Sequence, residues 1–260
     1  MKTYNNTIKY YELLMIFNDT SKYTKYELPN GYHFEYYKQG DEYDWIDIHI
    51  STGEFTSIDM GLEYFHTFFD SFINELDKRL IFIVEDNTNL KVGTSTISLL
   101  NNGECAVDWL AIRREYQGKK LSKPLISKTV ELAKELGHNK ITLHTQTTTW
   151  LAAIIYLDYG FEILNKEEKE GWGILKTLTH HPKLNEFEEL EYDDIFDKRN
   201  IEIQNILTDM YKTEDFNYSV WYKNGLHNVY TYLDGKTYEY EYYEENNNIV
   251  LKEVSSKYKK

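Results

Sequence analysis

The order of apolar patterns between residues 80 and 179 constrains the fold more than any other feature of this sequence. Short runs of apolar and β-branched residues, separated by turn-forming residues, predict strands. Two longer stretches repeat apolar residues every three or four positions, which predicts helices with one buried face. The predicted strands are Leu80–Glu85, Lys91–Leu100, Glu104–Ile112, Lys140–Thr145, Phe161–Leu164 and Gly173–Thr179, and the predicted helices are Leu121–Leu136 and Thr149–Tyr159.

The connections between these segments indicate how the strands run. Asp86–Asn89 is a turn, and Asn101-Asn102-Gly103 is a typical hairpin loop, so the first three strands form an antiparallel meander. Where a helix connects two strands, the second strand can return parallel to the first. The predicted fold class is therefore α/β, with a mixed β-sheet flanked by helices.

The first eighty residues add a strand and two helices to this sheet. We expect a strand at Tyr32–Lys38 and helices at Asp44–Ile50 and Ile58–Leu76. Residues 1–30 hold one short element near Tyr11–Phe17, and we interpret them as an N-terminal extension. The sequence thus predicts one domain over residues 1–180.

The character of the chain changes after His180-His181-Pro182. An acidic stretch leads into a predicted helix that reaches Met210, and four aromatic strands follow it. Residues 181–260 are therefore interpreted as an appended α+β module of unknown role. Its predicted strands are Tyr218–Lys223, His227–Leu233, Thr237–Tyr243 and Ile249–Val254, with turns at Asn224-Gly225, Asp234-Gly235 and Asn246–Asn248.

Composition excludes several classes of function. The formal net charge of -14 argues against a nucleic-acid partner, which would require a basic face. The apolar run Leu13–Phe17 is too short for a membrane span or a secretion signal. Cys105 is the single cysteine, and the histidines lack ligand spacing, so we expect no metal and a cytoplasmic location. The acidity reflects ordinary solubility or, alternatively, attraction for a cationic ligand.

The segment Tyr116–Ser122 stands between a predicted strand and a predicted helix. The first backbone N–H groups of a helix lack partners within it, and the helix dipole adds positive potential there. Such a loop binds phosphate, and Lys119, Lys120 and Lys123 would add charge. An ordinary strand-to-helix turn with Gly and Lys is the alternative.

Two motifs in this region resemble the GNAT superfamily of N-acetyltransferases. The family loop, Gln/Arg-x-x-Gly-x-Gly/Ala, is matched by Gln117, whereas Lys120 and Ser122 stand where its glycines are expected. The family's later segment, an Ala before a Tyr-x-x-x-Gly-Phe ending, is matched by Ala153 and Tyr156–Phe161. Both motifs occur in the right order on the elements that they require.

The resemblance implies that acetyl-CoA is the cosubstrate. In the family, the strand before the loop separates from its neighbour and its backbone pairs with pantetheine, and one N–H group stabilises the oxyanion. Tyr156 matches the frequent general acid, although it could also be one more core aromatic residue. The implied cosubstrate-binding residues are Leu110, Ala111, Ile112, Gln117, Gly118, Lys119, Lys120, Leu121, Ser122 and Ala153.

Two carboxylates are candidates for the base that takes a proton from the amine. Asp108 precedes Leu110 and Ile112 on one strand, and simple alternation places all three on one face. Several members of the family use a carboxylate on this strand. Glu54 lies in the linker between the first two helices, which usually borders the acceptor pocket in the family. Structural pairing is the alternative role for Asp108.

The sequence thus predicts direct acetyl transfer from acetyl-CoA to a primary amine. Cys105 lies too early on its strand for a covalent relay. One alternative is a catalytically silent module that binds CoA. Another is an interaction protein or homodimer formed through residues 181–260. The acceptor stays open among a small polyamine, an aminoglycoside-like drug, an amino acid and a protein amine, with no membrane partner expected.

Overall fold

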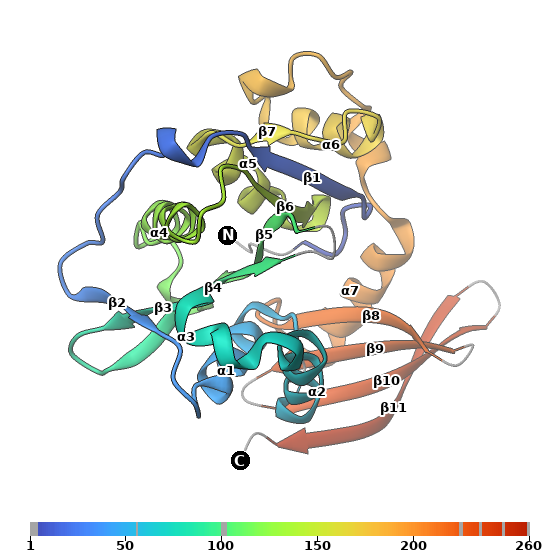
Figure 1. Cartoon of the computed structure of the whole chain (residues 1–260). Coiled ribbons are helices and arrows are strands. Elements are labelled where there is room, and N and C mark those ends of the chain that lie inside the picture. The colour runs from blue at the N-terminus through green and yellow to red at the C-terminus, as the bar shows by residue number, and fades with distance from the viewer. Residues whose placement is uncertain are drawn as a thin grey trace.

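The computed structural model describes residues 5–55, 57–99, 103–223, 226–233, 236–245 and 248–258. Within these residues, one mixed sheet has the strand order β2-β3-β4-β5-β6-β1-β7, and a second sheet has the order β11-β10-β9-β8 (Figure 1). The predicted α/β class is confirmed. The turn residues Asn101-Asn102, Asn224-Gly225, Asp234-Gly235 and Asn246-Asn247 lie outside the described residues. The strands are β1 (Glu12–Phe17), β2 (Tyr32–Tyr36), β3 (Leu80–Glu85), β4 (Leu90–Leu99), β5 (Cys105–Ile112), β6 (Ile141–Gln146), β7 (Glu162–Ile163), β8 (Asn217–Lys223), β9 (Leu226–Leu233), β10 (Lys236–Glu245) and β11 (Asn248–Tyr258).

Helices cover both faces of the mixed sheet, because successive side chains of its strands point to opposite faces and both faces are apolar. On β3, Ile81 and Ile83 enter the core beneath α4 and α5, whereas Phe82 and Val84 enter the core beneath α1 and α2. No helix among the described residues is both long and apolar enough to cross a membrane. The α-helices are α1 (Glu42–Thr52), α2 (Ile58–Phe69), α3 (Leu76–Arg79), α4 (Ser122–Glu135), α5 (Trp150–Tyr159), α6 (Lys169–Thr179) and α7 (Lys198–Tyr211).

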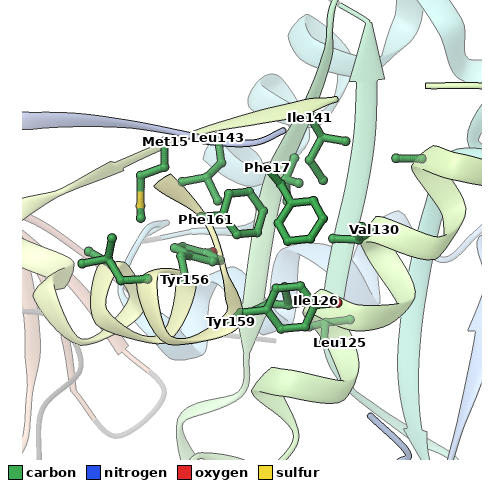
Figure 2. Packing of buried hydrophobic residues seen from close by; sticks show 14 of the residues in the cluster. Met15, Phe17, Leu125, Ile126, Val130, Ile141, Leu143, Tyr156, Tyr159 and Phe161 are labelled. Atoms are coloured by element: carbon green, nitrogen blue, oxygen red, sulfur yellow. The ribbon is translucent and has the colours of Figure 1, made fainter. Parts of the chain in front are cut away.

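The prediction of an N-terminal extension is wrong for Glu12–Phe17. This segment forms β1, which lies between β6 and β7 and is antiparallel to both. The alternate side chains Leu13, Met15 and Phe17 are buried, as a strand with one face on the core requires. Figure 2 shows Met15 and Phe17 packed beside Leu143 and Phe161 in this core.

The prediction of a strand at Gly173–Thr179 is also wrong, because these residues form the C-terminal part of helix α6. Gly171 and Gly173 of this helix permit close packing. A Cβ atom on Gly171 would lie 2.8 Å from the Cβ atom of Tyr11, and one on Gly173 would lie 2.8 Å from the carbonyl oxygen of Glu188. The glycines therefore let α6 approach the N-terminal segment and a later loop.

The single helix predicted over Ile58–Leu76 is interrupted. Helix α2 ends at Phe69, a 3₁₀ segment covers Asp70–Glu75, and α3 begins at Leu76. Phe72 has φ -139° and ψ 28°, which is outside the helical region. The apolar stripe is continuous across this break, so periodicity alone does not reveal it.

The C-terminal sheet packs between α7 and the rest of the molecule. On one face, Tyr218, Val229 and Tyr240 form a core with Ile203 and Leu207 of α7. From the other face, Tyr232 of β9 packs against the aromatic core beneath α1 and α2. A short antiparallel bridge, Ile8 with Phe196, ties the segment before α7 to the N-terminal residues. Residues 181–260 are therefore in contact with the mixed sheet's own elements.

Candidate active site

A β-bulge in β5 shapes the centre of the site. Asp108 pairs with Thr96 and Ala111 pairs with Thr94, so Trp109 and Leu110 together stand opposite one residue of β4. Trp109 has φ 53°, a left-handed conformation that costs a non-glycine residue about 1–3 kcal/mol. Its ring packs against those of Trp45, His49, Phe55, Tyr64 and Phe68, and this packing offsets the strain.

The bulge also overturns one prediction about Asp108. Because the bulge inserts a residue, side chains beyond it exchange faces. Leu110 and Ile112 pack with the core beneath α4, together with Val107, whereas Asp108 follows Val107 on the opposite face. The prediction that Asp108 shares a face with Leu110 and Ile112 is therefore wrong.

The end of β5 has a backbone edge turned away from β4. The parallel pairing of β5 with β6 covers Ala106 and Val107 only, so the two strands part beyond this point. The N–H of Arg113 donates to Val92 at 2.8 Å, and alternation turns the backbone groups of Ile112 to the opposite side. There the Ile112 carbonyl accepts a hydrogen bond from Gln117 Nε2 at 3.1 Å. Gln117 thus fixes the following loop to the end of β5.

The loop over residues 117–121 places positive groups at the start of α4. Gly118 has φ 78° and Lys120 has φ 63°, so a lysine occupies a left-handed position that glycine adopts more easily. Helix α4 begins at Ser122, and its N-cap residue, Leu121, makes no capping hydrogen bond with its side chain. Its first N–H groups and Lys123 therefore stand at one end of a cavity.

This cavity, here named the α4 cavity, has a volume of about 840 Å³. The loop and the start of α4 form one end of it, and the tip of β5 and helix α5 form its walls. Its charged lining residues are Lys120 and Lys123 near the loop, Glu54 at the far end, and Glu27, which is paired with Lys25 at 3.0 Å. Its lining also includes Tyr26, Leu28, Pro29, Ile126, Leu151 and Ile155.

A second cavity of about 690 Å³, here named the β8 cavity, borders the bulge of β5. Segments far apart in the sequence line it: the N-terminal residues Asn6, Ile8 and Tyr10, the turn after α1, the bulge of β5, the end of β6, α5, α7 and β8. From the C-terminal residues it receives Asn200 of α7 and Ser219 and Val220 of β8. The C-terminal module thus forms one wall of this cavity.

The two cavities meet, because five residues line both: Glu54, Leu110, Thr149, Ala152 and Tyr156. Tyr156 lies on α5 with its ring against Phe161, as Figure 2 shows. Burial raises the pKa of the Tyr156 hydroxyl well above its ordinary value, and the nearby charge of Glu54 raises it further. The phenol therefore stays protonated at neutral and alkaline pH.

Glu54 is oriented by a buried histidine. Its carboxylate lies 2.7 Å from His49 Nδ1, and the histidine side chain is fully buried whereas that of Glu54 is 32% exposed. An ionised carboxylate only accepts hydrogen bonds, so His49 donates its Nδ1–H. The other ring nitrogen, Nε2, is buried without a partner among the described residues. Glu54 follows Gly53, whose φ of 91° ends α1 and turns the chain toward the junction.

Asp108 lines the β8 cavity only. Burial raises the pKa of its carboxyl group, and the hydroxyl of Ser98, which donates a hydrogen bond to it, and the nearby His144 lower the pKa in part. The His144 ring is exposed, lies 3.3 Å from Glu12, and lines the same cavity. Asp108 and Glu54 are therefore brought to one cavity, but only Glu54 reaches the junction.

Other predicted site residues lie elsewhere. Leu121 and Ala153 are buried in the core, and it is Ala152 that lines both cavities. Lys119 places its ammonium group 3.9 Å from the centre of the Tyr116 ring. Sequence reasoning missed Thr149 and Ala152, although α5 had been located, because one residue of rotation decides which side chain faces a cavity. Asn200 and Ser219 carry no signal in the sequence.

The single cysteine is buried, and burial raises the pKa of the Cys105 thiol to about 12. Such a thiol is protonated at neutral pH and is a poor nucleophile. Across the described parts of the chain, no group of three His, Cys, Asp or Glu side chains is placed to hold a metal ion.

Known proteins resemble this chain as follows. The model of the acetyltransferase (GNAT) family matches residues 26–161, more than half of the chain. No curated protein matches. A GCN5-related N-acetyltransferase structure from Sphaerobacter thermophilus is 14% identical, with a TM-score of 0.49 over 61% of this chain and 49% of its own, so the match spans about half of that protein. A GNAT-family acetyltransferase from Staphylococcus aureus Mu50 is 20% identical, with a TM-score of 0.43 over 54% of this chain and 90% of its own.

Proposed function

This chain belongs to the GNAT family of acetyltransferases, and we propose that it transfers the acetyl group of acetyl-CoA directly to a primary amine. The observation that carries the proposal is the meeting of two cavities at Tyr156 and Glu54. Cosubstrate and acceptor can then be bound together, each in its own cavity, with the reacting atoms at the junction. Holding two reactants in this way removes much of the entropic barrier to transfer.

We assign the cosubstrate to the α4 cavity because its residues suit the chemistry of CoA. The N-terminus of α4, with Lys120 and Lys123, suits a pyrophosphate. The edge of β5 that is unpaired with β6 beyond Val107 suits a pantetheine chain, which carries amide groups. Acetyl-CoA supplies an activated thioester carbonyl and a thiolate leaving group.

Tyr156 is proposed to give its proton to the departing sulfur. A raised pKa makes the phenol a weak acid, but burial at the same place also makes the thiolate a stronger base, because desolvation penalises both anions. A bond forms between the amine nitrogen and the acetyl carbon, the carbon–sulfur bond breaks, and the sulfur takes the proton. Backbone N–H groups at the end of β5 would stabilise the oxyanion.

Glu54 is proposed to take the proton that the amine loses. An alkylamine with a pKa of about 10.4 is mostly protonated at pH 7, so a carboxylate near the transfer point assists. Glu54 lines both cavities, whereas Asp108 lines the acceptor side only. His49 is a positioning residue here, since its Nδ1–H holds the Glu54 carboxylate.

The test is acetyl-CoA binding and thiol release by the purified full-length chain with a panel of primary amines. We expect acetyl-CoA to raise the melting temperature, since a ligand at 100 times its Kd stabilises a protein by about 2.7 kcal/mol. We also expect free thiol to appear only when an amine is added. Binding without thiol release from any amine would instead identify a silent CoA-binding module, and no binding would refute the assignment of the α4 cavity.

A further inference from the structure

The two cavities differ in the charges of their lining. The α4 cavity contains two lysines near its loop end. Among the described residues that line the β8 cavity, by contrast, there is neither lysine nor arginine, while Glu54 and Asp108 are both present. His144 is the one lining side chain that can gain a positive charge, and it lies beside Glu12 and Asp108. The β8 cavity therefore offers negative charge and little to balance an anion.

Aromatic rings add to this preference. Phe55, Tyr64 and Trp109 also line this cavity, and an aromatic face that is open to a ligand attracts an ammonium group by about 0.5–2 kcal/mol. The Trp109 ring is held in place by Trp45, at a centroid distance of 5.1 Å, and by His49, at 5.3 Å. A ring fixed in this way loses little conformational entropy when a cation binds.

The C-terminal wall is neutral and polar. Asn200 and Ser219 contribute an amide and a hydroxyl group, and Asn6 lies on the same side of the cavity. The Asn6 side-chain amide donates a hydrogen bond to the Tyr218 backbone carbonyl, which links the N-terminal segment to β8. Such groups hydrogen bond to an uncharged part of a ligand, but they do not neutralise a carboxylate or a phosphate.

We propose that the acceptor is a small cationic amine that carries no carboxylate or phosphate group, and that the β8 cavity rejects amino acids. The proposal rests on the acetyl transfer proposed above. Its reason is that a carboxylate in this cavity would face Glu54 and Asp108 without a cationic partner, and unpaired like charges cost several kcal/mol. The primary amine stands at the junction, and Asp108 and the aromatic rings hold the rest of the cation.

The test compares acceptors that differ by the α-carboxylate alone: cadaverine with lysine, agmatine with arginine, and tyramine with tyrosine. We expect kcat/KM in the thiol-release assay to be about 100-fold higher for each amine than for its amino acid. Calorimetric titration of the same pairs into the CoA-saturated protein measures selectivity without turnover. This second readout separates a failure of selectivity from a failure of catalysis.

Two variants connect the selectivity to named residues. Asp108→Asn is expected to lower the ratio between cadaverine and lysine about tenfold, because one of the two repelling charges is lost. Ser219→Lys, which adds a cation to the C-terminal wall, is expected to shift the ratio toward lysine. The control is Asp209→Asn, which removes the same charge from an exposed position on α7 and should leave the ratio within about twofold.

Equal or reversed selectivity within the three pairs would overturn the proposal about the acceptor. Thiol release in the same assay would still support the proposed acetyl transfer. Absence of both binding and release for all three amines would also overturn it. If calorimetry shows the selectivity but no amine releases thiol, the result supports the proposed ligand class of the β8 cavity and contradicts the proposed acetyl transfer.

Discussion

The α4 cavity and the β8 cavity differ in how much of the chain is needed to build them. The end of the α4 cavity that we propose binds phosphate comes from one stretch, residues 110–126, in which strand, loop and helix follow each other directly. The β8 cavity needs Asn6, Ile8 and Tyr10, the turn at Gly53–Phe55, the bulge of β5, and α7 with β8. A cavity built from consecutive residues can therefore be recognised from a local motif, whereas a cavity built from distant segments is recognised only in the folded chain.

Tyr156→Phe should have the largest effect, because this side chain serves both cavities. We expect kcat to fall about 100-fold, the usual contribution of a positioned proton donor, with the Kd of acetyl-CoA changed less than about twofold. Steady-state kinetics and calorimetry measure the two. Tyr159→Phe is the control on the same helix, because its hydroxyl donates to the Thr24 carbonyl at 2.9 Å, away from the junction. An equal loss in both variants would contradict the role of Tyr156.

Filling one cavity at a time should separate the two binding functions. Ile155→Trp projects bulk into the α4 cavity and should weaken acetyl-CoA binding at least about tenfold. Ser219→Trp does the same in the β8 cavity and should raise the KM of the amine by a similar factor, with acetyl-CoA affinity unchanged. If Ser219→Trp weakened acetyl-CoA binding instead, the assignment of the two cavities would have to be exchanged.

Lys120 allows charge and backbone strain to be separated in the α4 cavity. Lys120→Ala and Lys120→Gly both remove the charge, and each should weaken acetyl-CoA binding about 3–10-fold. At φ 63°, however, glycine avoids the Cβ strain of about 1 kcal/mol, so the Gly variant should melt about 2–4 °C above the Ala variant. Thermal denaturation without ligand measures this difference. Equal melting temperatures would mean that the loop conformation is not strained.

Asp108→Asn should have the smallest effect on thermal stability, and that effect should be an increase. Burial raises the pKa of the Asp108 carboxyl group in the folded state above its pKa in the unfolded state, which is about 3.9. The contribution of this group to stability is therefore fully present below the unfolded-state pKa and is lost as the pH rises through the folded-state pKa. At pH 7 the ionised group therefore destabilises the fold, and the Asn variant should melt roughly 1–3 °C higher. The difference should shrink at pH 4. A lower melting temperature at pH 7 would indicate a structural role for Asp108.

Much of the α4 cavity could be predicted from the sequence, because its determinants are local. The periodicity of α4, the loop at Gln117–Lys120 and the ending Tyr156–Phe161 all follow from short patterns. Even there, the rotation of α5 was beyond prediction, so Ala153 was expected where Ala152 lines the cavity.

The β8 cavity could not be predicted, because each of its determinants depends on tertiary contacts. The bulge at Trp109 is stabilised by an aromatic cluster drawn from α1, α2 and the turn between them. Strand β1 takes its place between β6 and β7 through pairing with residues more than a hundred positions away. Ser219 gains its role because the C-terminal sheet packs against the mixed sheet's helices, which no pattern in the sequence indicates.

Two-substrate kinetics test most directly whether both cavities are occupied in one complex. Initial rates would be measured at several fixed amine concentrations while acetyl-CoA is varied, and double-reciprocal plots would be drawn. Direct transfer at the junction of the cavities gives lines that intersect, because both substrates must be bound before either product leaves. Parallel lines would mean that the enzyme carries the acetyl group itself between two half-reactions, and would contradict the ternary complex at Tyr156.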